Sequence, residues 1–248
     1  MTNKSKIALV TDAEHFVGIP TLAALHKAGF TCLAVDDSFE DSEARAAFED
    51  RMAGVTALAP QAPGALIATI EARFGRLDAL VSSDGHPAEK LIYFEEELSV
   101  LDTKFQQALD AMVTRPFSLI TAASRLMQTS GGGRIVVASS AAPMRGLVNY
   151  PVYAAVRGAQ NGLIKTLSLE MGPHNITINA LGFNFIKSPT YFPDRLISDP
   201  GILAKITKNI PLGRLGEPSE AGETIAFLCG EHGGFITGQV IPFAGGWA

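Results

Sequence analysis

The chain has few cysteines, no long hydrophobic run and no excess of positive charge, and each absence narrows the kind of protein it can be. Its two cysteines, Cys32 and Cys229, are too few for a disulfide framework and stand in apolar surroundings, so we expect buried free thiols. No apolar stretch is long enough to span a membrane, and the opening MTNKSKIALV leads into a strand rather than a secretory signal. The formal net charge is −5 without a basic run, which argues against nucleic acid as a partner. These features predict a cytoplasmic protein that binds neither nucleic acid nor membrane.

The histidines give no sign of a metal centre. They show no ligand spacing and do not cluster with cysteine along the sequence. The five are His15, His26, His86, His174 and His232. We therefore expect no metal site.

The order of apolar segments predicts the fold. Strands are expected at residues 6–11, 31–35, 55–58, 77–81, 134–138 and 176–181, with helices at 19–28, 38–52, 66–74, 98–128 and from about Tyr153 onward. The long helix at 98–128 should be interrupted near Pro116. Strands that alternate with helices in this way form a parallel sheet covered on both faces. The chain is therefore predicted to be one α/β domain over residues 1–248, a Rossmann-like doubly wound parallel sheet in three αβα layers.

Residues 182–200 form an expected long loop after the sixth strand. The segment is rich in Phe, Pro, Asn and Ser, and long connections in compact domains tend to be functional. Ligands of such sheets bind at the carboxyl ends of the strands. We expect this loop, Ser140 and the turn after the first strand to face one cleft.

Three polar residues near the fifth strand predict an acid–base site. Ser140 follows the apolar run RIVVA, Tyr153 comes thirteen positions later, and Arg157 lies four residues beyond Tyr153. A separation of four places Tyr153 and Arg157 on the same side of a helix. A phenol loses its proton only near pH ~10, and a neighbouring cation favours its charged form. An arginine supplies a cation that is never lost by deprotonation.

The turn after the first strand, TDAEHFVGIP, argues against a dinucleotide cofactor. A phosphate cradle there needs several glycines, and only Gly18 is present. Glu14 would repel a pyrophosphate, and His15 and Phe16 would fill its space. Asp36, just past the second strand, is then expected to be a surface or capping carboxylate rather than a ribose ligand.

The spacing Ser-x12-Tyr-x3-basic and the ending GQVIPFAGGW resemble the short-chain dehydrogenase/reductase superfamily. The chain departs from that superfamily at two places, with Arg157 in place of lysine and with the pattern T-x4-F-x-G from Thr11 to Gly18. In both features it is similar to the halohydrin dehalogenases, which keep that fold without a nicotinamide cofactor. The segments VSSD at 81–84, GFNF at 182–185 and PTYFP at 189–193 extend the resemblance over essentially the whole chain.

The resemblance implies a reaction and roles for residues. Vicinal haloalcohols would close to epoxides with release of halide and a proton, and small anions such as azide, cyanide, nitrite or halide would open epoxides in reverse. Tyr153 would be the base, Ser140 the donor to the substrate oxygen, and Asp84 a support of Arg157 through water. A homotetramer without cofactor is also implied.

The leaving halide needs a nest of backbone N–H groups and aromatic edges. The candidates from the first turn and from the loop are Phe16, Phe183, Asn184, Phe185, Ile186 and Tyr191. Many family members have proline where this chain has Phe183, so the backbone of the nest is expected to differ locally.

Each of these residues also has an alternative interpretation in which its role is purely structural. Ser140 could cap a turn, Arg157 could be a solvated helix residue, Asp84 could be a turn residue, and the aromatic residues could only pack the loop. Tyr150 lies three positions before Tyr153 and is the rival base. Two other functions also remain open: an NAD(P)-dependent oxidoreductase with an unusual first turn, and a non-catalytic relative that binds a small ligand.

Overall fold

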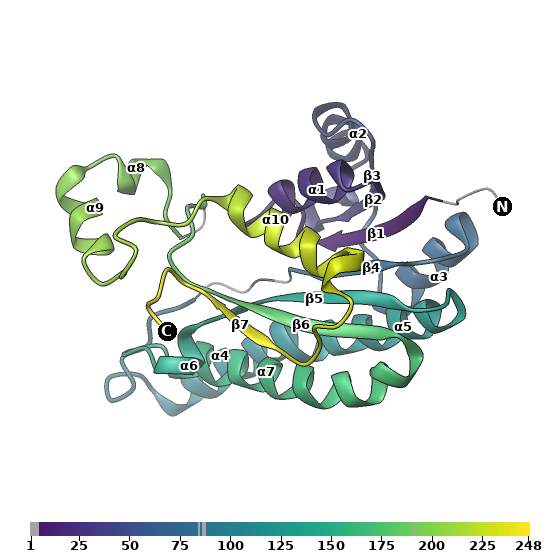
Figure 1. The fold of residues 1–248 in the computed structure, drawn as a ribbon. Helices are drawn as coiled ribbons and strands as arrows, with labels where there is room; N and C mark the ends of the chain where they lie inside the picture. The colour runs from purple at the N-terminus through teal and green to yellow at the C-terminus, as the bar shows by residue number, and fades with distance from the viewer. Residues whose placement is uncertain (1–4, 84, 86–87, 190) are drawn as a thin grey trace.

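The computed structural model describes residues 5–83, 85, 88–189 and 191–248. Within these residues seven parallel strands form one sheet in the order β3-β2-β1-β4-β5-β6-β7 (Figure 1). The strands are β1 Lys6–Thr11, β2 Phe30–Val35, β3 Val55–Leu58, β4 Ala79–Ser82, β5 Gly133–Ser140, β6 Ile176–Phe183 and β7 Val240–Phe243. The expected single-domain, Rossmann-like α/β fold is thereby confirmed.

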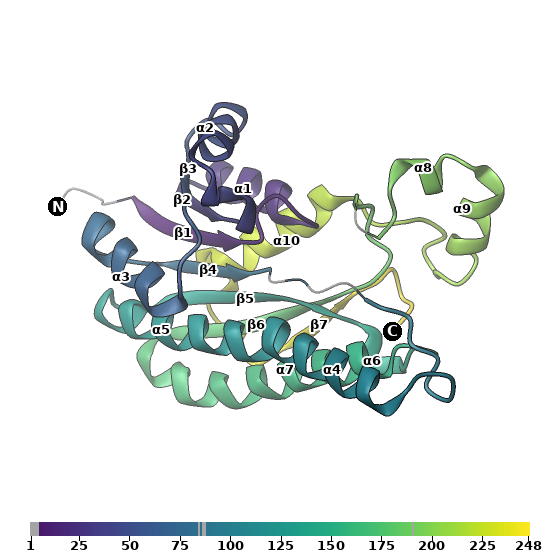
Figure 2. The same cartoon turned by 180° about the vertical axis from the view of Figure 1, so that it is seen from behind.

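Helices cover both faces of this sheet. They are α1 Gly18–Lys27, α2 Ser42–Arg51, α3 Pro63–Phe74, α4 Leu98–Leu109, α5 Arg115–Thr129, α6 Ala142–Arg145, α7 Pro151–Met171, α8 Asp194–Ile197, α9 Pro200–Thr207 and α10 Pro218–Cys229. Short 3-10 turns add η1 Asp37–Glu40, η3 Gly172–His174 and η4 Glu231–Gly233, and a π-helical segment, η2 Asp110–Thr114, joins α4 to α5. Helices α1 and α10 lie on one face, and α3, α5 and α7 lie on the other (Figures 1 and 2).

The core is divided by the sheet into two apolar layers. Leu22, Leu25 and Ile225 belong to the layer under α1 and α10, and Ile70 and Met127 belong to the layer under α3, α5 and α7. Because the strands are buried on both faces, they are almost continuously hydrophobic rather than alternating. No helix in the described part of the chain is long and apolar enough to cross a membrane. Cys32 and Cys229 are buried free thiols, as expected.

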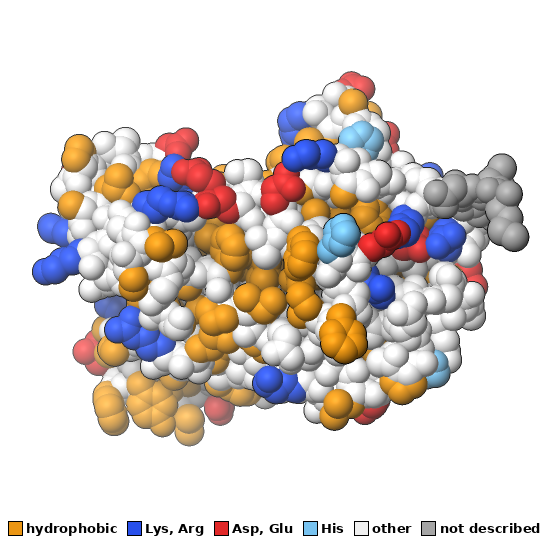
Figure 3. All heavy atoms as spheres, in the orientation of Figure 1, with side chains coloured by type: hydrophobic (Ala, Val, Ile, Leu, Met, Phe, Trp, Pro, Cys, Tyr) orange, Lys and Arg blue, Asp and Glu red, His pale blue; other side chains and the backbone are white. Residues whose placement is uncertain are grey.

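An extension stands beyond the carboxyl ends of the strands. Helices α8 and α9 project there from the connection between β6 and α10 (Figure 1). On the face shown in Figure 3, hydrophobic side chains gather between this extension and the sheet. The functional cleft is therefore expected between the extension and the strand ends.

Three sequence predictions need correction. The helix expected at 38–52 is two elements, because the Asp41 side chain accepts a hydrogen bond from the Glu43 N–H and starts a new helix there. Strand β6 runs on to Phe183, so this residue ends a strand rather than following one. The segment 182–200 is not a structureless loop, since it contains α8 and the start of α9.

Candidate active site

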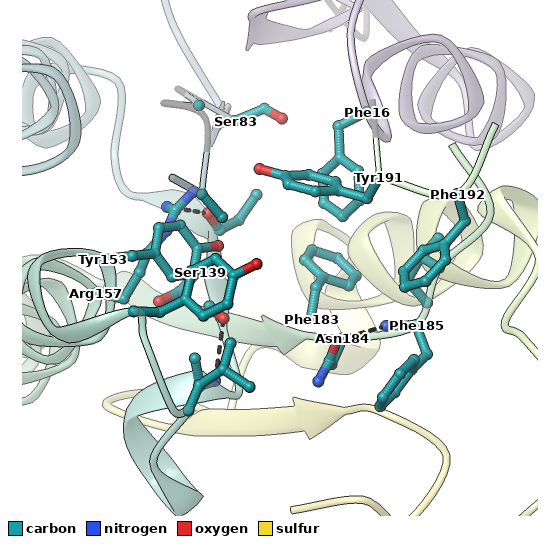
Figure 4. Close-up of a pocket in the computed structure, with 18 of the residues that line it drawn as sticks. Phe16, Ser83, Ser139, Tyr153, Arg157, Phe183, Asn184, Phe185, Tyr191 and Phe192 are labelled. Atoms are coloured by element: carbon teal, nitrogen blue, oxygen red, sulfur yellow. Dashed lines mark hydrogen bonds between the residues drawn. The ribbon is translucent and has the colours of Figure 1, made fainter. Parts of the chain in front are cut away.

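A cavity of about 840 Å³ opens at the carboxyl ends of the strands. The residues predicted from the sequence that line it are Phe16, Ser140, Tyr153, Arg157, Phe183, Asn184, Phe185, Ile186 and Tyr191. Asp84, the predicted support of Arg157, lies outside the described residues. One wall carries the polar groups of β5 and α7, and the opposite wall is aromatic (Figure 4). The fold thus brings the first turn, the strand ends and the segment 182–200 to one cavity. This is the location expected from the rule that ligands of such sheets bind at the carboxyl ends of the strands.

Ser140 is the last residue of β5 and is buried. Its Oγ accepts a hydrogen bond of 3.0 Å from the Ala142 N–H at the start of α6. The turn-capping reading of Ser140 is therefore correct. Because a serine hydroxyl has one donor hydrogen besides its acceptor lone pairs, it still has a hydrogen to give to a ligand oxygen.

Tyr153 and Arg157 lie one turn apart on α7, and the Arg157 guanidinium carbon is 5.3 Å from the centroid of the Tyr153 ring. Arg157 is only 4 % exposed, so the solvated reading of this residue is wrong. One of its terminal nitrogens donates to the Ala138 carbonyl and to Gln160 Oε1, each at 2.9 Å. Among the described residues its Nε has no hydrogen-bond partner. A buried cation with one unpartnered donor is thus held against the phenol ring.

Gln160 is a residue of the site that the sequence reasoning missed. It is buried one turn beyond the predicted arginine, and its amide nitrogen donates to the Met112 carbonyl in the π-helical segment η2. The amide oxygen of Gln160 receives the arginine, so the side chain connects Arg157 to η2. A glutamine three residues after an arginine on a helix is a local signal for such a pair.

Tyr191 extends the polar group from the opposite wall. Its ring meets that of Phe16 edge-to-face at 5.6 Å between centroids, and its hydroxyl points across the cavity toward the wall that carries Tyr153 (Figure 4). Burial raises the pKa of Tyr191 to about 12, helped by the charges of Tyr153 and Asp12 and opposed by Arg157. Tyr191 therefore stays protonated at neutral pH and is available as a donor. Tyr150 also lines the cavity, so position alone does not remove it as a rival base.

Edge-to-face contacts join the aromatic residues of the other wall. Phe16 meets Phe183 at 5.2 Å between ring centroids, and Phe183 meets Phe243 at 5.5 Å. Phe16 and Phe185 both have positive φ, 44° and 57°. Such backbone strain costs about 1–3 kcal/mol per residue and is concentrated at functional sites. The aromatic residues pack on one another, as the blander reading expected, and they also form the cavity wall.

Two backbone N–H groups of the predicted halide nest, those of Asn184 and Phe185, have protein acceptors. The Asn184 N–H donates to the Phe243 carbonyl at 3.2 Å, and the Phe185 N–H donates to the Asn184 side-chain oxygen at 2.9 Å. The first bond belongs to the sheet edge, whereas the second is held only by a side chain. An anion would reach the Phe185 N–H after the Asn184 amide turns away.

The first turn does not fit the pyrophosphate of a dinucleotide. Its Ala13 N–H donates to Val35, its Glu14 N–H to the Asp36 carboxylate, and its Gly18 N–H to His15. A Cβ at Gly18 would lie 2.3 Å from the Ala13 carbonyl oxygen, so this glycine serves a close backbone contact rather than a ligand.

The carboxylates around this turn have protein partners too. Glu14 forms an ion pair of 2.6 Å with Arg51. Asp36 is buried and accepts from Glu14 and from both the N–H and the hydroxyl of Ser38, so the capping reading is correct and the surface reading is wrong. Asp12, His15 and Asp36 bring ligand atoms within 4.8 Å of one another, a grouping that the sequence spacing did not show. Since the oxygens of Asp36 already have these donors, we do not assign a metal to the cluster.

Comparisons with known proteins agree on the family. The sequence model of a family described as enoyl-(acyl carrier protein) reductase matches residues 17–248. The short-chain reductase protein NovJ of Streptomyces niveus is 30% identical over an alignment of 253 positions, which covers 98% of this chain and 94% of NovJ. The chain therefore belongs to the short-chain dehydrogenase/reductase superfamily.

Two solved structures are similar over the whole chain. One, described as a dehalogenation enzyme, is 42% identical with a TM-score of 0.93 and covers 100% of both chains. The other is a halohydrin dehalogenase bound to ethyl (2S)-oxiran-2-ylacetate, 30% identical with a TM-score of 0.91 over 97% of this chain and 96% of that one.

Proposed function

We propose that this protein is a cofactor-independent halohydrin dehalogenase, a carbon–halogen lyase that converts vicinal haloalcohols to epoxides. The observation that carries the proposal is the pairing of two features in one cavity. Ser140, Tyr153 and Arg157 converge on one wall, and Phe16 faces them from the turn where a dinucleotide binder needs open space. The similarity to two structures described as dehalogenases supports the same reading.

Tyr153 is the base in this mechanism. Its phenolate takes the proton of the substrate hydroxyl, and the freed oxygen attacks the adjacent carbon while the carbon–halogen bond breaks. The proton then leaves to water and the halide leaves as an anion. No hydride moves, so the reaction needs no nicotinamide. General acid–base catalysis of this kind contributes about 10²–10⁴-fold to rate.

Ser140, Arg157 and Tyr191 support this proton transfer. The Ser140 hydroxyl donates to the substrate oxygen, since its acceptor side already receives Ala142. The Arg157 charge lies against the Tyr153 ring, and the protonated Tyr191 hydroxyl, which points toward Tyr153 from the opposite wall, is the donor proposed for the Tyr153 phenolate. Both interactions favour the phenolate. Asp84 is proposed to support Arg157 through water, by resemblance to the family.

The halide is proposed to leave toward the aromatic wall. The positive edges of Phe16 and Phe183 face an anion there. The Phe185 N–H joins them when the Asn184 amide releases it, and Ile186 and Tyr191 complete the lining. In the reverse direction the same nest would hold azide, cyanide, nitrite or halide for epoxide opening. A homotetramer remains our expectation for the assembly.

An NAD(P)-dependent reductase is the second candidate, favoured by the name of NovJ and by the description of the matching family. One experiment separates the two. Purified protein is mixed with a bromoalcohol without nicotinamide, and bromide and proton release are followed. Equal amounts of both ions without nucleotide would support the lyase. Turnover that appears only with NAD(P)H, and then on a carbonyl substrate, would overturn it.

A further inference from the structure

The cavity continues past the reacting groups toward the first turn, into a lobe that the proposed reaction does not use. Ser83, the residue directly after β4, lines this lobe together with Asp12, His15 and Gly85. We call this part of the cavity the Ser83 lobe. A total volume of about 840 Å³ is far more than a small haloalcohol fills.

The Ser83 hydroxyl is buried and has no partner. The residue is 3 % exposed, and among the described residues its Oγ makes no hydrogen bond. The position of Ser83 is fixed, because its backbone N–H donates to Thr11 Oγ1 at 3.1 Å and Thr11 is itself buried. Figure 4 shows the Ser83 hydroxyl on the side of the cavity toward which the Tyr191 hydroxyl also points. A buried hydroxyl without a partner carries a desolvation penalty, which a ligand that hydrogen-bonds to it would remove.

The surroundings of the lobe indicate what kind of group fits. The Asp12 carboxylate lies next to Gly85, since a Cβ added there would be 3.1 Å from its oxygen, and its charge acts on Tyr191. The Tyr191 hydroxyl stays protonated, and a phenol oxygen can accept a hydrogen bond as well as donate one. A carboxylate in the lobe would be repelled by Asp12, and an ammonium group has no lone pair to accept a hydrogen bond from Ser83. An uncharged hydroxyl can both donate to these acceptors and accept from Ser83.

We propose that Ser83 is a substrate-binding residue that holds a second, uncharged hydroxyl group of the haloalcohol or epoxide. This proposal rests on the proposed dehalogenase function and adds a substrate class to it: haloalcohols that carry a further hydroxyl beyond the reacting pair of carbons. Ser140 and Tyr153 hold the reacting oxygen, the aromatic wall takes the halide, and Ser83 holds the remaining polar end.

The test compares two substrates of nearly equal shape, a chloropropanediol and the chlorobutanol in which a methyl group replaces its terminal hydroxyl. A second pair, one carbon longer, tests a greater distance between the reacting carbons and the second hydroxyl. The measured quantity is the ratio of kcat/KM for the diol to kcat/KM for its methyl analogue. We expect the wild-type ratio to exceed one and to fall by about tenfold in Ser83→Ala for at least one pair, as expected for one lost hydrogen bond.

Thr177→Val is the matched control. Thr177 is also buried with an unpartnered hydroxyl, but it lies on β6 and is not among the residues lining the cavity. Its substitution should leave the ratio unchanged. Halide release with equal ratios in the wild type and in Ser83→Ala would overturn the subsite alone. No halide release from any of the four substrates would overturn the proposed function and the subsite with it.

Discussion

The Arg157 guanidinium covers the face of the Tyr153 ring, 5.3 Å from its centroid, instead of meeting the phenol oxygen end-on. Two acceptors fix it there, the Ala138 carbonyl and Gln160. The positive charge therefore acts on the whole ring, and the phenol oxygen stays open to a substrate.

Arg157→Lys should lower kcat/KM for haloalcohol by about 100-fold, a typical effect of misplacing a catalytic group by an ångström. A lysine keeps the charge but lacks the planar donors that reach Ala138 and Gln160 together. The remaining activity should require higher pH. Arg145→Lys is the control, because Arg145 lies over Trp247 at 5.0 Å and not against the base. An Arg157→Lys enzyme with the wild-type rate and pH profile would contradict the assignment.

Tyr153→Phe should reduce dehalogenation by about 10²–10⁴-fold, because only the proton acceptor is removed. Tyr150 lines the same cavity, and the variant Tyr150→Phe should keep most of the activity. Halide release under identical conditions, with thermal unfolding as a check of the fold, compares the two variants. The opposite order of activities would mean that Tyr150 is the base.

Tyr191→Phe should move the pH at which dehalogenation reaches half of its maximum upward. The pKa of Tyr191 is raised to about 12, so below that pH its hydroxyl keeps a proton that it can donate to the Tyr153 phenolate. Without this donor the phenolate loses a stabilising hydrogen bond, and a lower proton concentration is needed to form it. The pH dependence of kcat/KM measures the shift. A profile that only falls in height, with no displacement along pH, would assign Tyr191 to packing alone.

Phe16→Ala should weaken inhibition by bromide. If the edge of Phe16 faces the leaving halide, its loss removes part of the anion nest while Ser140 and Tyr153 keep their places. We expect bromide to compete with haloalcohol in the wild type and its inhibition constant to rise in the variant. Phe192→Ala is a useful comparison, because Phe192 lines the same cavity but contacts Phe185 rather than Phe16. An unchanged constant for bromide in Phe16→Ala would exclude Phe16 from the halide site.

Neither NAD(H) nor NADP(H) should bind at micromolar concentration. The N–H groups of Ala13, Glu14, His15 and Gly18 in the first turn already have protein acceptors, and Phe16 lines the cavity. Calorimetric titration of the four nucleotides tests this, with a nucleotide-dependent reductase as the positive control. A micromolar dissociation constant for any of them would contradict the reading of the first turn.

The sequence was most informative where function imposes a spacing. The separations between Ser140, Tyr153 and Arg157 place all three at one cavity because a strand end and two successive helical turns have fixed geometry. The sequence was least informative where contacts are made by residues distant along the chain. The placement of Tyr191 opposite Tyr153 in the cavity, and the contact of Phe185 with Trp247, bring together segments whose approach no local pattern encodes.

Local misreadings had equally physical causes. The expected helix at 38–52 was split by Asp41, whose side chain competes with continued helix by capping a new one. The sixth strand was predicted to end at residue 181, with Gly182 assigned to the loop that follows, whereas β6 extends to Phe183. Its partner strand β5 continues past it, and Ser140 pairs with Phe183 in register.

The π-helical segment η2 connects the outer helices to the chemistry of the cavity. In a regular α-helix the Met112 carbonyl would accept the N–H of residue 116, but that residue is Pro116, which has no N–H to give. The Gln160 amide is the donor that reaches this carbonyl, and Gln160 in turn holds Arg157. A proline in the helix outside the sheet thus creates the acceptor that orients a buried arginine. Changes at position 116 would be transmitted to the site without altering any residue that touches substrate.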